Sequence, residues 1–161
     1  MNKKVVVITG ASSGIGKALA LKFAKEGWDL VIAARRIELL KDLENQLPGV
    51  NILSVKTDVT QENECKELID KTIGKFGKID VLINNAGISM RASFEDVKTE
   101  VLHKLMDVNY WGTVYCTKYA LSSLIKNNGS LVGVISVGGY VGLPGRTGYS
   151  ASKFAVRGFL D

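Results

Sequence analysis

Histidine, cysteine and proline are scarce in this chain of 161 residues, which has one histidine, two cysteines and two prolines. With His103 as the sole imidazole, no histidine-based zinc site can be built, and no metal site is predicted. Cys65 and Cys116 are too few to form a disulfide framework, so we interpret them as reduced packing residues. The shortage of proline excludes a proline-rich linker, and the seventeen glycines follow no collagen-like repeat.

Long hydrophobic runs are also lacking. The four apolar residues from Val5 to Ile8 follow two lysines, as in a leader peptide, but Thr9 and Gly10 end the run after too few residues. No stretch is long enough to cross a membrane. With 46% hydrophobic and 23% charged residues, the composition is that of one folded domain over residues 1–161. We therefore expect a cytoplasmic protein with no membrane contact.

Acidic residues are rare at both ends of the chain, and the formal net charge is +5. Such an excess is compatible with nucleic-acid binding or with a polyanionic small molecule such as a phosphorylated cofactor. There is no dense run of lysine and arginine and no recognisable nucleic-acid module, so no nucleic-acid partner is predicted. A solvated basic surface accounts for most of the individual lysines.

Apolar runs of strand length alternate with stretches of helical periodicity along the whole chain. Strands are predicted at 4–9, 30–34, 51–55, 81–83 and 131–136, and helices at 15–25, 37–47, 62–76, 97–126 and from 149 onward. Strands that alternate with helices form parallel pairs through crossover connections. The pattern predicts an α/β fold with a doubly wound parallel sheet, Rossmann-like, in which five strands are present.

A glycine-rich segment, Thr9–Gly16, lies at the first strand-to-helix junction. A dinucleotide site needs a tight turn, close backbone approach to a pyrophosphate and a helix N-terminus aimed at it, and Gly10, Gly14 and Gly16 supply these features. The spacing differs from the usual G-x-G-x-x-G, and an ordinary glycine-rich turn would also account for the glycines alone. The position of the segment favours a cofactor site.

The end of the second predicted strand favours NADP over NAD. An acidic residue at this point would hold the ribose 2′-hydroxyl group of NAD, but the chain has Ala34, followed by Arg35 and Arg36. Alanine leaves room for a 2′-phosphate, and a guanidinium group pairs well with it. Two solvated arginines at a helix start are the alternative, although the helix dipole disfavours cations there.

Tyr149 and Lys153 are four residues apart in a predicted helix, so they share a face. A nearby lysine cation favours the phenolate form of a tyrosine, which can then exchange a proton with an alcohol or a developing alkoxide. The pair alone is weak support, because lysines are common in this chain.

The motifs taken together are specific. T-G-A-S-S-G-I-G at Thr9–Gly16, N-N-A-G at Asn84–Gly87, Asn109, Ser136 and Y-S-A-S-K at Tyr149–Lys153 occur in one order on one α/β frame. Nearly the whole chain, from Lys3 to Asp161, closely resembles the short-chain dehydrogenase/reductase family. The resemblance implies an NADP-dependent oxidoreductase that moves a hydride between nicotinamide and a carbonyl or secondary alcohol.

The resemblance also implies roles for single residues. Tyr149 would be the general acid/base, and Lys153 would support it and bond the nicotinamide ribose. Ser136 would bond the substrate oxygen, and Asn109 would position a proton-relay water. Asp58 would contact adenine, although it could simply cap the next helix. The predicted cofactor-binding set is Gly10, Ser12, Ser13, Gly14, Ile15, Gly16, Arg35, Arg36, Asp58, Val59, Asn85, Ala86, Gly87, Tyr149 and Lys153.

The chain departs from the family pattern at its end. Family members continue past this lysine with two further strands and a substrate-covering segment, and the last helix here has no stop signal before Asp161. We therefore expect a domain that is incomplete at its C-terminus, either part of a normal enzyme or a non-catalytic nucleotide-binding fragment. Residues 142–148 and 154–161 look like the hydroxysteroid dehydrogenase and carbonyl reductase branch, with a 3-oxoacyl thioester reductase as the alternative. Pairing into a homo-oligomer is a further expectation.

Overall fold

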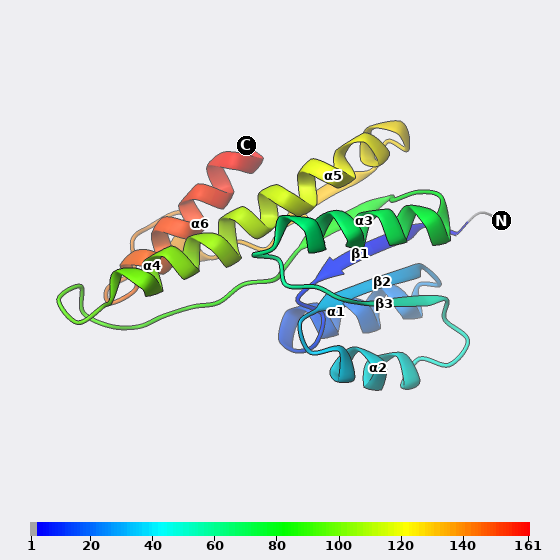
Figure 1. Ribbon diagram of the computed structural model, residues 1–161, viewed down its shortest axis with the longest axis horizontal. Helices are drawn as coiled ribbons and strands as arrows, with labels where there is room; N and C mark the ends of the chain where they lie inside the picture. Colours follow the sequence, from blue (N-terminus) through cyan, green and yellow to red (C-terminus); the bar gives the residue numbers. More distant parts are fainter. Residues whose placement is uncertain (1–2) are drawn as a thin grey trace.

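A computed structural model describes residues 3–161 of the chain. Its centre is a five-stranded parallel sheet in the order β3-β2-β1-β4-β5, with helices on both faces (Figure 1). The strands are β1 (Val5–Thr9), β2 (Asp29–Ala34), β3 (Ile52–Lys56), β4 (Val81–Asn84) and β5 (Ser130–Gly133). The helices are α1 (Gly14–Lys25), α2 (Ile37–Asn45), α3 (Glu62–Phe76), α4 (Thr99–Leu105), the π-helical η1 (Met106–Trp111), α5 (Gly112–Lys126), the 3-10 helix η2 (Val137–Gly139) and α6 (Thr147–Leu160). The doubly wound parallel sheet predicted from the sequence is confirmed.

The alternation of side chains along β1 divides the core into two layers. Val5 and Val7 pack with residues of α3 and α5 on one face, whereas Val6 and Ile8 pack with residues of α1 and α2 on the other. All five residues of β1 are buried. A strand that is apolar on both faces needs helices on both sides, which explains why β1 reads as a continuous apolar run.

The two cysteines lie in the layer between the sheet and the helices α3 and α5. Both are free and fully buried, which confirms their interpretation as reduced packing residues. A hydrogen bond with Cys65 and burial together raise the pKa of the Cys116 thiol. The neutral thiol is therefore the favoured form at this position.

The helix predicted at 97–126 begins at Thr99 and is not uniform. α4 passes into the π-helical turn η1, and α5 then runs on to Lys126. A π turn contains an extra residue for each hydrogen-bonded ring and occurs frequently at functional sites. A Cβ atom at Gly112 would lie 2.7 Å from Cγ2 of Val59, so the helix approaches the end of β3 more closely than any other residue type allows. The periodicity of the sequence could not reveal this local change of helix type.

The strand predicted at 131–136 ends at Gly133, which corrects the prediction by three residues. Val134 N–H still donates to Asn84 O, at 2.9 Å, but Val134 O accepts a hydrogen bond from the ammonium group of Lys153 at 2.8 Å. β5 ends at Gly133 because its partner strand β4 ends at Asn84, the residue that pairs with Gly133. The helix predicted from Tyr149 likewise starts earlier, at Thr147.

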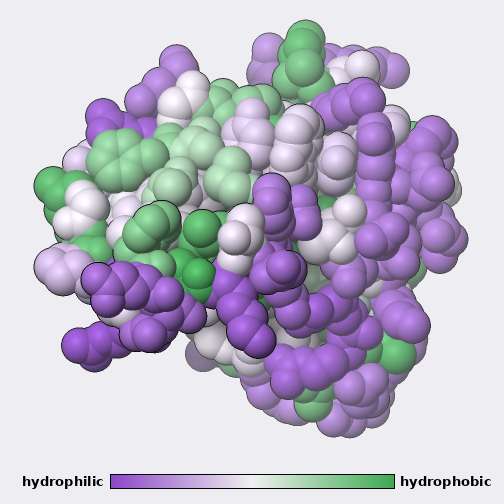
Figure 2. Space-filling model, turned by 60° about the vertical axis from the view of Figure 1, so that its left-hand side comes forward, coloured by the Kyte–Doolittle hydropathy of each residue, from purple (hydrophilic) through white to green (hydrophobic). Residues whose placement is uncertain are grey.

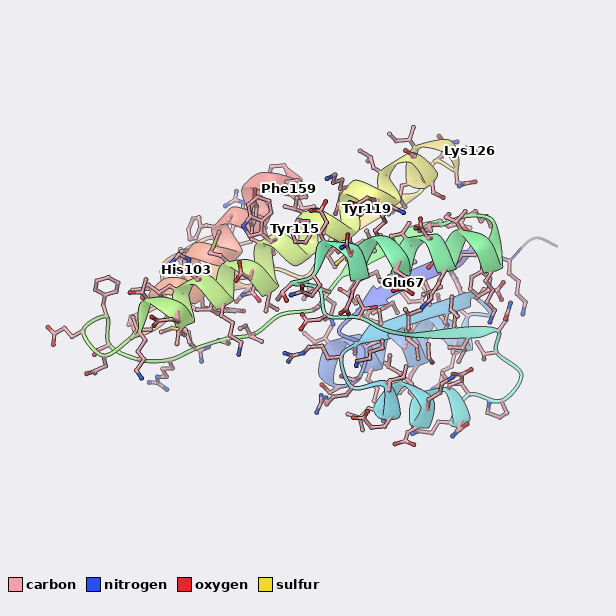
Figure 3. All side chains as sticks on the ribbon, viewed as in Figure 1. Glu67, His103, Tyr115, Tyr119, Lys126 and Phe159 are labelled. Carbon is pink, nitrogen blue, oxygen red and sulfur yellow. The ribbon has the colours of Figure 1, made fainter. Side chains whose placement is uncertain are left out.

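The surface of residues 3–161 is mixed in character. Figure 2 shows hydrophobic side chains gathered on one part of the face in view, with hydrophilic residues over much of the rest. Leu131 and Val132 of the edge strand β5 are exposed, and so are Trp111 and Phe159. His103 is an exposed residue of α4 (Figure 3). None of the described helices combines the length and the apolar character that a bilayer crossing requires.

Candidate functional site

A cavity of about 320 Å³ lies beyond the C-terminal ends of β1, β2, β3 and β4. The chain connects β1 to β2 and β3 on one side, whereas β4 and β5 lie on the other side of β1, so the cavity sits where the strand order reverses. Its lining comes from the loops that follow these four strands and from η1. The lining residues are Gly10, Ser12, Ser13, Ile15, Ala34, Arg35, Arg36, Thr57, Asp58, Val59, Asn85, Ala86, Gly87, Ile88 and Val108.

The loop after β1 brings backbone amide groups to the cavity. Gly10 has a φ of 67°, a left-handed conformation that favours glycine. A Cβ atom at Gly16 would lie 2.5 Å from the side-chain nitrogen of Asn85 and still closer to the carbonyl oxygen of Gly10. The first turn of α1 has no acidic residue, and its N-cap residue Ser13 makes no side-chain capping bond. The N–H groups of this turn are therefore available to an anion, as a pyrophosphate site requires.

Thr9 and Asn85 join the ends of β1 and β4 beneath the cavity. The hydroxyl oxygen of Thr9 accepts hydrogen bonds from the backbone N–H groups of Asn85 and Ala86, both at 3.0 Å. The Asn85 side-chain amide donates back to Thr9 O at 2.9 Å and to Gly10 O at 3.3 Å. These bonds fix the glycine loop against the strand on its other side. Thr9 begins the glycine-rich motif but is not in the predicted cofactor-binding set.

Arginines form the wall of the cavity beyond β2. Arg36 donates to the hydroxyl group of Ser12 at 3.2 Å, which links the wall to the glycine loop. Arg35 is exposed and also lines the cavity, beside Ala34. Two guanidinium groups and a small side chain thus stand where β2 ends.

The residues after β3 form the next part of the wall, beside the end of β2, where Thr57 N–H donates to Ala34 O at 3.0 Å. Asp58 accepts hydrogen bonds from the N–H and hydroxyl groups of Thr60 at 3.0 Å and 2.9 Å, so one carboxylate oxygen caps the following turn. Asp58 and Val59 also line the cavity. The carboxylate thus caps the turn before α3 and not the helix itself, whose N-cap residue is Gln61 without a side-chain cap.

Tyr149 and Lys153 lie together one turn apart on α6. The ammonium nitrogen of Lys153 is 5.9 Å from the centre of the Tyr149 ring. Lys153 is 7% exposed, and burial lowers the pKa of its ammonium group. A Cβ atom at Gly87 would lie 3.6 Å from Lys153 Nζ, so the pair stands at the Gly87 end of the cavity, although neither residue lines it.

Asn109 is buried in the π turn, and its amide connects three parts of the site. Its side-chain oxygen accepts the Ile88 N–H at 2.8 Å, and its nitrogen donates to Ile88 O at 3.0 Å and to the Ser152 hydroxyl at 2.8 Å. Ser152 in turn donates to Tyr149 O at 2.8 Å. Asn109 therefore holds the loop after β4 against the helix of the catalytic candidates. Ser152 lies between Tyr149 and Lys153, but it was not among the predicted site residues.

Ser136 begins the loop that leads from β5 to α6. Its hydroxyl oxygen accepts the Gly138 N–H at 3.2 Å, which leaves the hydroxyl hydrogen free to donate elsewhere. A Cβ atom at Gly138 would lie 3.3 Å from Cε1 of Tyr149. The short helix η2 thus brings the backbone next to Ser136 against the tyrosine ring.

Most of the predicted cofactor-binding residues meet at the cavity. Gly14, Gly16, Tyr149 and Lys153 do not line it. Gly14 is exposed, Gly16 is buried against Gly10 and Asn85, and Lys153 stands near Gly87 with Tyr149 one turn away. Thr57, Ile88 and Val108 line the cavity and were missing from the prediction. Each is adjacent in sequence to a predicted residue, so the motifs located the loops without marking every side chain in them.

The fold is a doubly wound α/β sheet, and its cavity lies where sheets of this kind bind ligands. A family model for short chain dehydrogenases matches residues 4–161, and the chain belongs to this family. The chain is 41% identical over 163 residues to an 11-beta-hydroxysteroid dehydrogenase-like 3 from Arabidopsis thaliana, covering 99% of this chain and 53% of that protein. It is also 41% identical over 165 residues to an 11-beta-hydroxysteroid dehydrogenase from Pinus massoniana, covering 100% and 46%. The chain spans about half the length of these curated relatives.

Solved structures show the same fold. An alcohol dehydrogenase from the archaeon Thermococcus sibiricus, complexed with 5-hydroxy-NADP, superposes with a TM-score of 0.95 at 32% identity, covering 98% of this chain and 68% of that one. A short chain dehydrogenase/reductase from Burkholderia phymatum, in complex with NAD, gives a TM-score of 0.94 at 31% identity, covering 98% and 58%. The two neighbours thus carry different nicotinamide cofactors.

Proposed function

We propose that this protein, at its full natural length, is an NADP-dependent oxidoreductase that transfers a hydride between nicotinamide and a carbonyl or secondary alcohol. The observation that best supports this function is the position of the Tyr149–Lys153 pair at the Gly87 end of the cavity. Arg35 and Arg36 line the same cavity at the end of β2. The relatives named as hydroxysteroid dehydrogenases support a carbonyl or alcohol substrate of this kind.

The residues present fit a nicotinamide dinucleotide. The uncapped amides at the start of α1 suit a pyrophosphate, and the close approach at Gly16 explains the absence of a side chain there. Arg35 and Arg36 suit the 2′-phosphate of NADP, and Asp58 and Val59 form the wall for the adenine end. Complexes of structural neighbours with 5-hydroxy-NADP and with NAD support a nicotinamide cofactor in general.

The protein's own contribution to the reaction is one proton and its placement. The bound cofactor would supply or accept the hydride at its nicotinamide ring. In the reducing direction the Tyr149 hydroxyl donates its proton to the carbonyl oxygen as that oxygen gains negative charge. The free hydroxyl hydrogen of Ser136 donates to the same oxygen, and the Lys153 cation stabilises the phenolate that remains. Asn109 acts through its bonds to Ile88 and Ser152, which position the two sides of the site.

Cofactor oxidation is the test of this function. NADPH absorbance is followed with a panel of aldehydes and ketones, using the protein translated from its complete reading frame and, beside it, the 161-residue chain. We expect the protein from the complete reading frame to consume NADPH with at least one carbonyl compound. Absence of turnover with the whole panel, despite measurable NADPH binding, would contradict the proposal and favour a nucleotide-binding role.

We also propose that the protein pairs with a second copy through η1, α5 and α6. Aromatic residues gather on this side of the molecule: the ring centres of Trp111 and Tyr115 are 5.6 Å apart, and those of Tyr110 and Phe159 are 6.2 Å apart. Figure 3 shows Tyr115 on α5 and Phe159 on α6. Trp111 and Phe159 are exposed, as an interface of this kind requires. Gel filtration of the protein tests the pairing, and elution as a monomer would contradict it.

The cytoplasm remains the expected compartment.

A further inference from the structure

Arg146 lies at the start of α6, and its charged side chain reaches the loop that follows β4. Its guanidinium Nη1 donates to the hydroxyl group of Ser89 at 2.7 Å. The two segments are joined a second time, because Ala92 N–H donates to Gly145 O at 2.9 Å. The arginine therefore occupies a defined position between two loops.

That position is next to the proposed reacting groups. The guanidinium carbon of Arg146 lies 5.9 Å from the centre of the Tyr149 ring. Ser89, its hydrogen-bond partner, comes two residues after Gly87, which marks the Lys153 end of the cofactor cavity. Arg146 itself does not line that cavity. The guanidinium group thus stands beside Tyr149, the proposed proton donor, and outside the lining of the cofactor cavity.

The charge of Arg146 is not neutralised by an acidic side chain among residues 3–161, since Arg146 takes part in none of the described ion pairs. The stem of Arg91 passes close to the same turn, because a Cβ atom at Gly145 would lie 3.7 Å from its Cγ. The first turn of α6 contains no acidic residue and has no side-chain cap. A hydrogen bond to one serine uses only part of a guanidinium group that has five N–H donors.

We propose that Arg146 is a specificity-determining residue that binds an anionic group, a carboxylate or a phosphate, on the carbonyl substrate. The inference rests on the proposed oxidoreductase function and names the substrate class for the same site. A guanidinium group binds carboxylate and phosphate oxygens through charge-assisted and often paired hydrogen bonds. Loss of one such bond from a bound substrate costs roughly ten- to a hundredfold in affinity.

The test compares charged and neutral forms of the same carbonyl compound. One arm uses a 3-oxo carboxylate and its methyl ester, and the other uses dihydroxyacetone phosphate and dihydroxyacetone. For each pair kcat/KM is measured with NADPH for the wild type, Arg146→Gln and Arg146→Lys. Arg157→Gln is the matched control, because Arg157 lies on the same helix but over the ring of Tyr140, 4.2 Å away. The arm with the larger wild-type preference identifies the anion.

We expect Arg146→Gln to lower kcat/KM for the charged form of the preferred pair about ten- to a hundredfold, with less than about a threefold change for the neutral form. Arg146→Lys should keep part of the preference, and Arg157→Gln should keep all of it. Equal losses for charged and neutral forms would overturn the inference, because Arg146 would then act on Tyr149 or on the loop alone. No preference in the wild type would overturn it as well.

A binding measurement separates this inference from the proposed function. Calorimetric titration of the charged compounds into the protein with cofactor present needs no turnover. If no substrate is turned over but Arg146→Gln abolishes binding of the anion, the oxidoreductase proposal fails and the anion site stands. If wild type and Arg146→Gln bind the charged compounds equally, the anion site is refuted, whatever the turnover.

Discussion

Lys153 is a buried lysine with a proposed catalytic function, and burying its ammonium group costs stability. It is 7% exposed, and its ammonium group donates to Val134 O at 2.8 Å without an acidic partner among the described ion pairs. Burial lowers the pKa of this group, because the charged form loses its hydration. Residues kept at such a cost concentrate at functional sites.

The lowered pKa of Lys153 predicts a pH-dependent stability. Between its folded-state pKa and about 10.5, the unfolded chain holds a proton that the folded protein has released, so the wild type gains stability as the pH rises. Lys153→Met lacks this gain. We therefore expect the free energy of unfolding of the variant, minus that of the wild type, to fall between about pH 7 and about pH 10. Urea denaturation at several pH values measures this difference.

Lys118→Met serves as the control for that series. A hydrogen bond to Glu62 raises the pKa of Lys118, so its charge is retained in both folded and unfolded states below about pH 10.5. The control's difference from the wild type should stay level over the same range. A level difference for Lys153→Met as well would show that the lysine is not appreciably desolvated.

Arg35 is predicted to determine the choice of cofactor. A charge-assisted hydrogen bond contributes about 1.5–3 kcal/mol, so NADP should bind roughly ten- to a hundredfold more tightly than NAD. Arg35→Ala should remove most of this preference by weakening NADP alone, and Ala34→Asp should shift it toward NAD through repulsion of the phosphate. Titrations of both cofactors against each variant give the ratios. If Arg35→Ala keeps the wild-type ratio, the phosphate site lies elsewhere, with Arg36, which contacts Ser12, and Ser13 as the next candidates.

The glycine loop and α1 act as one element, since the turn at Gly10 sets where the helix begins. At Gly16 an alanine methyl group would meet backbone of Gly10 and the Asn85 amide, which itself is held by two hydrogen bonds. We expect Gly16→Ala to destabilise the fold by about 1–3 kcal/mol and to weaken cofactor binding. Chemical denaturation and cofactor titration provide the two measurements.

Gly74 offers a matched control in α3. It lies inside the helix, and a Cβ atom there would meet no heavy atom within 4 Å. Gly74→Ala should therefore stabilise the protein by about 0.5–1 kcal/mol through helix propensity. If Gly16→Ala, like Gly74→Ala, did not lower the free energy of unfolding, Gly16 would not be closely packed against Gly10 and Asn85.

At the scale of elements, the sequence predicts what depends on local pattern. The apolar run of β1 and the terminating glycine of α3, Gly77 with a φ of 73°, are read directly from residue types. The π turn at Asn109 is not, because it depends on contacts with Ile88 and Ser152, far apart in sequence. The early end of β5 has a long-range cause too, since its partner strand β4 ends at Asn84, opposite Gly133.

At the scale of the whole molecule, a parallel sheet brings the ends of distant strands to one edge. The motifs after β1, β2, β3 and β4 are separated in sequence, yet all of them reach the same cavity. The topology was predictable because alternating strands and helices permit few arrangements. The position of Arg146 beside Tyr149 was not, because it depends on how two loops meet through Ser89 and Gly145.

The most direct test of the account is the turnover of Tyr149→Phe. The substitution removes only the phenolic hydroxyl group, and Tyr149 does not line the cofactor cavity, so NADPH affinity should change little. Without its proton donor, kcat for carbonyl reduction should fall at least about a hundredfold. NADPH consumption and NADPH binding are measured on the same preparations of wild type and variant. Turnover of Tyr149→Phe at the wild-type rate would contradict the assignment of this site.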